Sequence, residues 1–229
     1  MSYKGKKLLR LMRKARNYNN FIVDMILKSM ENQGKNCLDF GSGYGYFAQL
    51  LRRKGGCNIT CVEIDEMFSD RCKKLDFEVY DDLDKLENNQ FDFVYTLNVL
   101  EHIEDDKKTL LLLKNKLNKN GKLFIFVPAF QILYSSFDKQ IGHYRRYVKS
   151  DLVGFLEENN FEIKTSKYMD SFGFVLALGY KLFNIKNGEI NLFQILVFDK
   201  ILFPIGRIFD RLTMGKLFGK NLIIEAKLK

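Results

Sequence analysis

The sequence of 229 residues predicts an α/β fold: a seven-stranded, mostly parallel sheet with helices on both faces and a helical insertion before the last strand. Three observations predict it. Short apolar runs alternate with helical stretches, a glycine-rich turn follows the first run, and a long apolar segment precedes the last one. Strands separated by helices imply right-handed crossovers and therefore a mostly parallel sheet. We expect a single domain over residues 1–229.

Seven apolar segments are the expected strands. They are residues 36–40, 59–64, 77–80, 91–96, 122–127, 161–167 and 221–227. Before them, apolar side chains recur at helical spacing from Leu8 to Met30, which predicts one amphipathic helical entry. In the insertion, residues 171–218, we expect Pro204 and Gly206 to break segment 191–212 into two helices. The broad apolar faces are compatible with a lid, a dimer interface or a membrane-docking element.

Composition bounds the function without choosing it. The net charge of +9 is compatible with nucleic acid, an anionic membrane face or acidic substrates, and basic residues cluster in segment 1–30. The four cysteines form no CxxC pair, so we expect no zinc site and no metal. The sequence has no signal-peptide pattern and no apolar run of the roughly 18 residues that suggest a membrane span. We therefore expect a cytoplasmic protein.

The turn after the first strand predicts a nucleotide-type cofactor site. In Asp39-Phe40-Gly41-Ser42-Gly43-Tyr44-Gly45-Tyr46, the glycines let the backbone approach a ligand closely, and the next helix offers unpaired N–H groups. A dinucleotide fold requires GxGxxG, but here Gly45 comes one place early. Asp39 would repel a pyrophosphate and attract an ammonium group. The pattern disfavours NAD and favours a zwitterionic amino-acid tail.

The end of the second strand supplies a carboxylate for this cofactor. Glu63 lies about 22 residues after Gly41, the separation at which an acidic residue reaches ribose hydroxyls. Asp65, two residues on, is a weaker candidate for the same role, and we expect it to be exposed.

These residues, with the fourth-strand segment FDFVYTLNVLEHIED, resemble the class I S-adenosylmethionine-dependent methyltransferases. The resemblance covers residues 36–168 and the last strand, and it implies a Rossmann-like fold with S-adenosylmethionine as cofactor and S-adenosylhomocysteine as product. It implies the following cofactor contacts: Asp39, Gly41, Gly43 and Gly45 at the methionine moiety, Glu63 on the ribose, Ile64 on the adenine, Asp81 or Asp82 at the adenine amino group, and Asn98 at the methionine end.

Both histidines follow expected strand ends, where ligands bind in open α/β sheets. His102 and His143 are candidates for a catalytic base or an acceptor-positioning group, because imidazole titrates near neutral pH. The loop around His143 resembles an acceptor loop of small bacterial members of the family. Its candidate acceptor-binding residues are Tyr134, Tyr144, Arg145 and Arg146. The arginines suit an anionic acceptor, and structural ion pairs are the alternative.

The sequence therefore predicts methyl transfer to a small-molecule acceptor or a lipid- or glycan-linked acceptor, at oxygen. A nucleic-acid methyltransferase or binder is one alternative, disfavoured because no nucleic-acid module is recognised. An NAD-dependent oxidoreductase on a related sheet is the other. The basic, apolar insertion adds two expected partners, an anionic membrane at the cytoplasmic face and a second copy of the chain.

Overall fold

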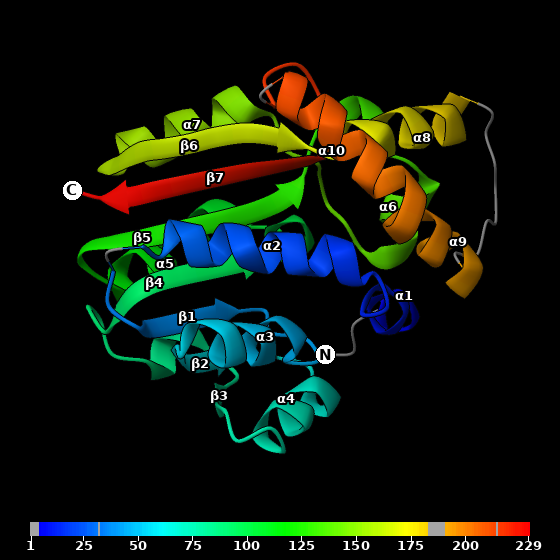
Figure 1. Cartoon of the computed structure of the whole chain (residues 1–229). Helices are drawn as coiled ribbons and strands as arrows, with labels where there is room; N and C mark the ends of the chain where they lie inside the picture. The colour runs from blue at the N-terminus through cyan, green and yellow to red at the C-terminus, as the bar shows by residue number, and fades with distance from the viewer. Residues whose placement is uncertain (1–4, 32, 183–190, 214) are drawn as a thin grey trace.

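The computed structural model describes residues 5–31, 33–182, 191–213 and 215–229, and it confirms the predicted fold class (Figure 1). The sheet has seven strands in the order β3-β2-β1-β4-β5-β7-β6. They are β1 (Asn36–Phe40), β2 (Asn58–Val62), β3 (Glu78–Tyr80), β4 (Phe91–Leu97), β5 (Leu117–Pro128), β6 (Phe161–Met169) and β7 (Asn221–Leu228). The β1–β2, β2–β3, β1–β4 and β4–β5 pairings are parallel, whereas β7 runs antiparallel to β5 and β6.

Helices bury an apolar cluster on each face of the sheet. On one face α2 (Arg16–Ser29) and α3 (Tyr46–Gly55) pack over the strands, with α4 (Glu66–Lys73) beside β3. On the other face lie α5 (Asp106–Lys116) and α7 (Lys149–Glu158). Because both faces are covered, β4 and the second half of β5 are almost continuously buried, as central parallel strands are.

The parallel strands end at one edge of the sheet, at the right of Figure 1, where α1 (Lys6–Met12) and α6 (Ser136–Ile141) also lie. The chain order reverses between β1 and its neighbour β4. At such a switch point the loops leave β1 and β4 in opposite directions and open a crevice, which is where ligands bind in open α/β sheets.

The N-terminal segment forms two helices, so the prediction of one helical entry was wrong. The break lies at Ala15, whose φ of −76° and ψ of 73° are not helical. Asp199 of the insertion accepts the backbone N–H groups of Asn17 and Tyr18, at 3.1 and 2.9 Å. It thereby caps the start of α2. The apolar spacing continues across the break, so only this tertiary contact reveals it.

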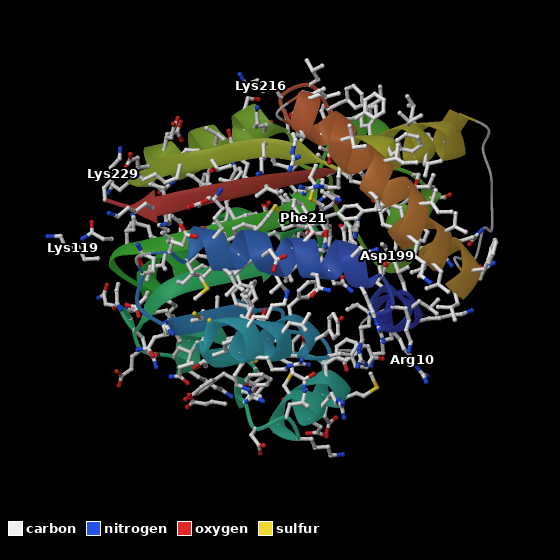
Figure 2. The ribbon with its side chains drawn as sticks, viewed as in Figure 1. Arg10, Phe21, Lys119, Asp199, Lys216 and Lys229 are labelled. Carbon is white, nitrogen blue, oxygen red and sulfur yellow. The ribbon has the colours of Figure 1, made fainter. Side chains whose placement is uncertain are left out.

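The insertion packs beside α2 through one face of a bent helix. It contains α8 (Ser171–Leu182), α9 (Leu192–Val197), a π-helical turn (Phe198–Leu202) and α10 (Phe203–Leu212). The predicted break at Pro204 lies a few residues earlier, at this π-helical turn. Pro204 itself is in the first turn of α10, where a residue needs no partner for its backbone nitrogen. Figure 2 shows Asp199 in this bend, facing α2. Residues 183–190 of the predicted insertion lie outside the described residues.

Candidate cofactor and acceptor site

The glycine-rich turn between β1 and α3 has the conformation that the sequence predicts. Gly41 has a φ of +81°, and a Cβ there would lie 2.3 Å from Cγ2 of Val99. Gly45 has a φ of +67° and directly precedes α3, whose N-terminus has no side-chain cap. The turn therefore combines left-handed backbone with N–H groups that can face a ligand.

Asp39 places a buried carboxyl beside this turn. It is 3% exposed, and its Oδ2 has no hydrogen-bond partner in the described structure. Burial, reinforced by the charge of Glu63, raises the pKa of Asp39 to about 7. A cation such as the ammonium of an amino-acid tail would compensate this carboxylate, so the residues fit the expected cofactor.

Glu63 lies just after β2 and ties the two parts of the cofactor site together. Its Oε2 accepts the N–H of Gly43 at 2.7 Å, and its Oε1 accepts the N–H of Asp65 at 2.8 Å. Burial raises the pKa of Glu63. Each oxygen keeps a lone pair that a ribose hydroxyl can use. Next to it, the side chain of Ile64 is 61% exposed, as expected of an apolar surface for adenine.

Asp65 is buried, which corrects the expectation that it is exposed. It is 3% exposed, accepts the N–H of Met67 at the start of α4, and pairs with Lys6 of α1 at 2.7 Å. This N-cap role explains an aspartate at the turn between strand and helix.

Asp81 and Asp82, the two predicted partners of the adenine amino group, lie side by side in the turn after β3, and the choice between them stays open. Asp81 pairs with Lys85 at 2.6 Å, and Asp82 accepts the N–H of Asp84 at 3.0 Å. Both carboxyls are exposed. Asn98, directly after β4, is exposed and has a φ of +54°, an uncommon conformation for a residue other than glycine.

Helix α1 covers the glycine-rich turn. Leu9 lies against Gly43, where a Cβ would approach its Cδ2 at 3.4 Å, and the guanidinium of Arg13 lies over the rings of Tyr44 and Tyr46 at 5.3 and 5.6 Å. Part of the basic N-terminal cluster is thus engaged with the cofactor turn. Apolar spacing alone does not predict this contact.

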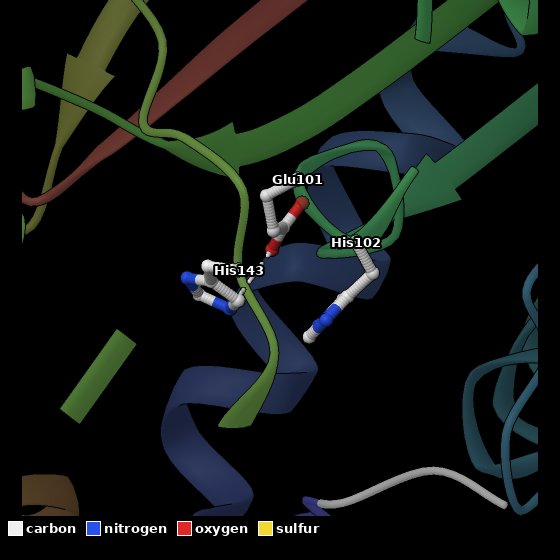
Figure 3. A group of neighbouring side chains, drawn as sticks. All are labelled: Glu101, His102 and His143. Atoms are coloured by element: carbon white, nitrogen blue, oxygen red, sulfur yellow. Dashed lines mark ion pairs between the residues drawn. The ribbon is translucent and has the colours of Figure 1, made fainter. Parts of the chain in front are cut away.

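On the acceptor side, the fold brings together the two histidines, which are 41 positions apart in sequence. Their ring centroids lie 4.6 Å apart in an edge-to-face arrangement. Nδ1 of His102 lies 3.2 Å from the carbonyl of Gly142, and Nδ1 of His143 lies 2.8 Å from Oδ1 of Asp138. Figure 3 shows both rings beside Glu101, the residue before His102.

The pKa values of three groups around the histidine pair are shifted, and in different directions. Burial and then the charge of His143 lower the pKa of His102 to about 4. Burial raises the pKa of Glu101 to about 8, against the opposing charge of Arg146. Burial alone would raise the pKa of Asp138, but His143 and Arg146 hold it at about 2. Asp138 is therefore the fixed anion that orients His143.

The other acceptor-side candidates already have protein partners. Arg145 forms an ion pair with Asp106, and Arg146 donates from Nε to Asp138 at 3.0 Å. The Tyr134 hydroxyl donates to the carbonyl of His143 at 2.7 Å, whereas Tyr144 is 53% exposed. The arginines hold the loop in place, and Tyr144 has the side chain most accessible to an acceptor.

A mostly parallel sheet with a switch point, a glycine-rich turn after β1 and a carboxylate after β2 are typical of an α/β enzyme that binds a nucleoside cofactor. A methyltransferase domain family matches residues 11–166, and the chain belongs to it. It is a class I S-adenosylmethionine-dependent methyltransferase, which decides against the NAD-dependent alternative.

Known proteins resemble the chain in sequence and in fold. The mitochondrial ubiquinone biosynthesis O-methyltransferase of Schizosaccharomyces pombe is 26% identical over 183 residues, covering 69% of this chain and 66% of that enzyme. The chain thus spans just under two thirds of that relative. The structure of an S-adenosylmethionine-dependent methyltransferase from Thermotoga maritima has a TM-score of 0.65 at 14% identity, covering 99% of this chain and 98% of that one. One from Archaeoglobus fulgidus has a TM-score of 0.60 at 19% identity, covering 91% and 94%. Both show the shared fold.

Proposed function

We propose that the protein transfers the methyl group of S-adenosylmethionine to an oxygen nucleophile of a small or lipid-linked acceptor. The observation that carries this proposal is the pair of histidines in the loops that follow β4 and β5, with His143 oriented by the carboxylate of Asp138. The S. pombe relative, named as an O-methyltransferase, supports oxygen as the acceptor atom.

The cofactor would be held by groups that the sequence predicts. Asp39 pairs with the ammonium of its amino-acid tail, the turn at Gly41 and Gly43 lies against that tail, and Glu63 accepts the ribose hydroxyls. The bound sulfonium supplies an electrophilic methyl group, so the protein has to position the acceptor, exclude water and remove its proton.

The histidine pair would manage the proton of the acceptor. The Gly142 carbonyl can only accept a hydrogen bond, so Nδ1 of His102 donates to it, and Asp138 likewise keeps the proton of His143 on Nδ1. In both neutral rings the lone pair is then on Nε2. A hydroxyl placed at either Nε2 can donate its proton there or be oriented by it.

Release of S-adenosylhomocysteine from a panel of phenols, glycolipids and hydroxy acids tests this proposal. We expect one acceptor class to support turnover, and His143→Gln to lower kcat by about 100-fold or more, as for a lost general base. His102→Gln measures the contribution of the second ring. Near wild-type kcat in both variants would reject the role of the histidines, and no turnover on any acceptor would count against oxygen transfer.

We also propose that the outer face of the insertion docks on an anionic membrane and so gives access to a lipid-linked acceptor. Apolar side chains at helical spacing are exposed there: Ile201 (52%), Ile205 (41%), Ile208 (61%) and Leu212 (75%). Lys200, Arg211 and Lys216 are exposed nearby. Such a face can lie in the headgroup region. No described helix is long and apolar enough to cross a membrane.

Co-sedimentation with vesicles tests the docking. We expect binding to vesicles rich in phosphatidylserine at low salt, weaker binding at high salt, and loss of binding in Ile208→Ser/Leu212→Ser. The matched control is Leu111→Ser, an exposed leucine on α5, away from the insertion. Equal binding of the double variant and the control would reject this surface, as would dimerisation through the same residues.

A further inference from the structure

Glu101, His102 and His143 form a cluster that the methyl-transfer proposal does not fully use. One ligand atom from each residue, a carboxylate oxygen or a ring nitrogen, lies within 4.8 Å of the others. Figure 3 shows the carboxyl of Glu101 directed toward His143. Nε2 of His143 lies 3.8 Å from Oε1 of Glu101. Two residues come from the turn after β4 and one from the loop after β5, so the fold assembles the cluster.

Glu101 lacks the hydrogen bonds that a buried carboxyl requires. It is 0% exposed, and neither of its carboxyl oxygens has a hydrogen-bond partner in the described structure. Buried polar groups are nearly always paired, because an unpaired buried carboxylate is strongly destabilising. A group that the described residues do not provide is expected to compensate this carboxyl.

Both histidines offer a ring nitrogen to this cluster. Both rings carry their proton on Nδ1, toward the Gly142 carbonyl and Asp138, so a neutral ring has its lone pair on Nε2. A histidine whose other nitrogen donates to a carboxylate or a carbonyl is the usual arrangement around bound metals. Nε2 of His143 lies on the side of the Glu101 carboxyl, and a ring nitrogen of His102 lies within 4.8 Å of the other two ligand atoms.

We propose that Glu101, His102 and His143 bind a divalent transition-metal ion of the Zn²⁺ type. Two imidazoles and one carboxylate are a common ligand set for Zn²⁺ and for Fe²⁺, and three protein ligands leave coordination positions open. Bond lengths of about 2.1 Å require the three side chains to move inward by about an ångström. His143 lies about 40 positions after the adjacent Glu101 and His102, and no cysteine takes part, which is why the search for a cysteine-based zinc pattern led to the expectation of no metal.

The use of this ion in catalysis rests on the proposed function, but its binding does not. An open position can take the acceptor hydroxyl, whose pKa a divalent cation lowers. The histidines would then act on the acceptor through the ion and not as free bases. A proton shared between Glu101 and His143 is the competing explanation for the unpaired carboxyl, and it predicts no metal affinity.

Metal titration of the full chain, prepared without a histidine tag and stripped with a chelator, tests the proposal. We expect Zn²⁺ to bind at one ion per chain by calorimetry and to raise Tm, because an ion that binds only the folded state stabilises it. Co²⁺ should give visible absorption bands with nitrogen and oxygen ligation. Absence of saturable binding of both ions to the wild-type chain would overturn the proposal.

Glu101→Gln gives the sharpest comparison. It keeps the shape of the side chain and removes its charge, so we expect at least tenfold weaker Zn²⁺ binding and an equal or higher Tm without metal. Glu104→Gln, an exposed glutamate three residues on, is the matched control and should behave as the wild type. If Glu101→Gln does not fold, His102→Gln tests the same site. Undiminished Zn²⁺ affinity in a folded ligand variant would overturn the assignment.

Binding and turnover are measured separately so that the two proposals can fail separately. Wild-type Zn²⁺ affinity that depends on Glu101 supports the metal site even if no acceptor is methylated. If the chelator-treated protein methylates an acceptor but binds no Zn²⁺, the proposed methyl transfer is supported and the proposed metal site is overturned. Binding of S-adenosylhomocysteine by each variant reports an intact fold.

Discussion

The cofactor side and the acceptor side of this crevice are built in different ways. The cofactor side consists of two short stretches, residues 39–45 and 63–65, on adjacent strands and linked by the bond from Gly43 to Glu63. The acceptor side is assembled from side chains of two separate segments, with Glu101 in one and Asp138 and His143 in the other. The first depends on backbone conformation and the second on side-chain pairing, so substitutions should affect them differently.

Gly41→Ala should have the largest effect on stability and cofactor binding, because it changes a position where the cofactor side depends on backbone conformation. The new Cβ meets Val99 at 2.3 Å while φ stays at +81°, and we expect a loss of about 2–5 kcal/mol of stability from strain and overpacking. Binding of S-adenosylhomocysteine should be lost. Thermal unfolding and calorimetry measure both.

Gly154→Ala is the matched control for this prediction. Gly154 lies within α7, with nothing within 4 Å of an added Cβ, so alanine should gain about 0.5–1 kcal/mol. A Gly41→Ala protein as stable as this control would show that the turn tolerates a side chain.

Glu63→Gln should have the next largest effect. A charge-assisted hydrogen bond contributes about 1.5–3 kcal/mol, so we expect S-adenosylhomocysteine to bind roughly 10- to 100-fold more weakly. The amide also faces the N–H of Gly43 or Asp65 with one of its own donors. Glu66→Gln, at an exposed glutamate three residues on, should leave Kd unchanged. Equal Kd values for the two variants would show that Glu63 does not bind the ribose.

The same contrast explains what the sequence could predict. The strands and the glycine-rich turn follow from apolar runs and from a contiguous motif, and the structure reproduces them with small changes of boundary. The break at Ala15 and the burial of Asp65 depend on Asp199 and Lys6, which are distant partners. Both histidines could be selected as candidates, but Glu101 and Asp138 could not, because their roles come from burial and from loop geometry.

Asp39 should make cofactor binding depend on pH. Its folded pKa of about 7 lies above the unfolded value, so the folded state holds the proton more tightly, and ionisation destabilises the fold as pH rises from about 4 to about 7. Only the ionised carboxyl attracts an ammonium. The Kd of S-adenosylmethionine should therefore fall about fivefold from pH 6 to pH 7 by linkage.

Calorimetry in buffers of different ionisation enthalpy measures this proton release directly. Asp39→Asn should bind more weakly and lose most of the pH dependence, leaving the smaller contribution of Glu63. An unchanged pH profile in Asp39→Asn would assign the titration to another group.

Lys6→Ala should have the smallest effect, and it tests whether the cofactor side extends beyond its two stretches. Lys6 pairs with Asp65 while 30% of its side chain is exposed, so the pair should contribute no more than about 1 kcal/mol. If α1 covers the bound cofactor, the Kd of S-adenosylhomocysteine should rise two- to threefold, with a smaller difference at high salt. Lys14→Ala, at an exposed lysine of the same basic segment, should leave Kd unchanged. In both variants Asp65 keeps its bond to the N–H of Met67. Equal changes in Kd for the two variants would therefore show that the net charge of the segment affects cofactor binding and that the pair of Lys6 with Asp65 does not.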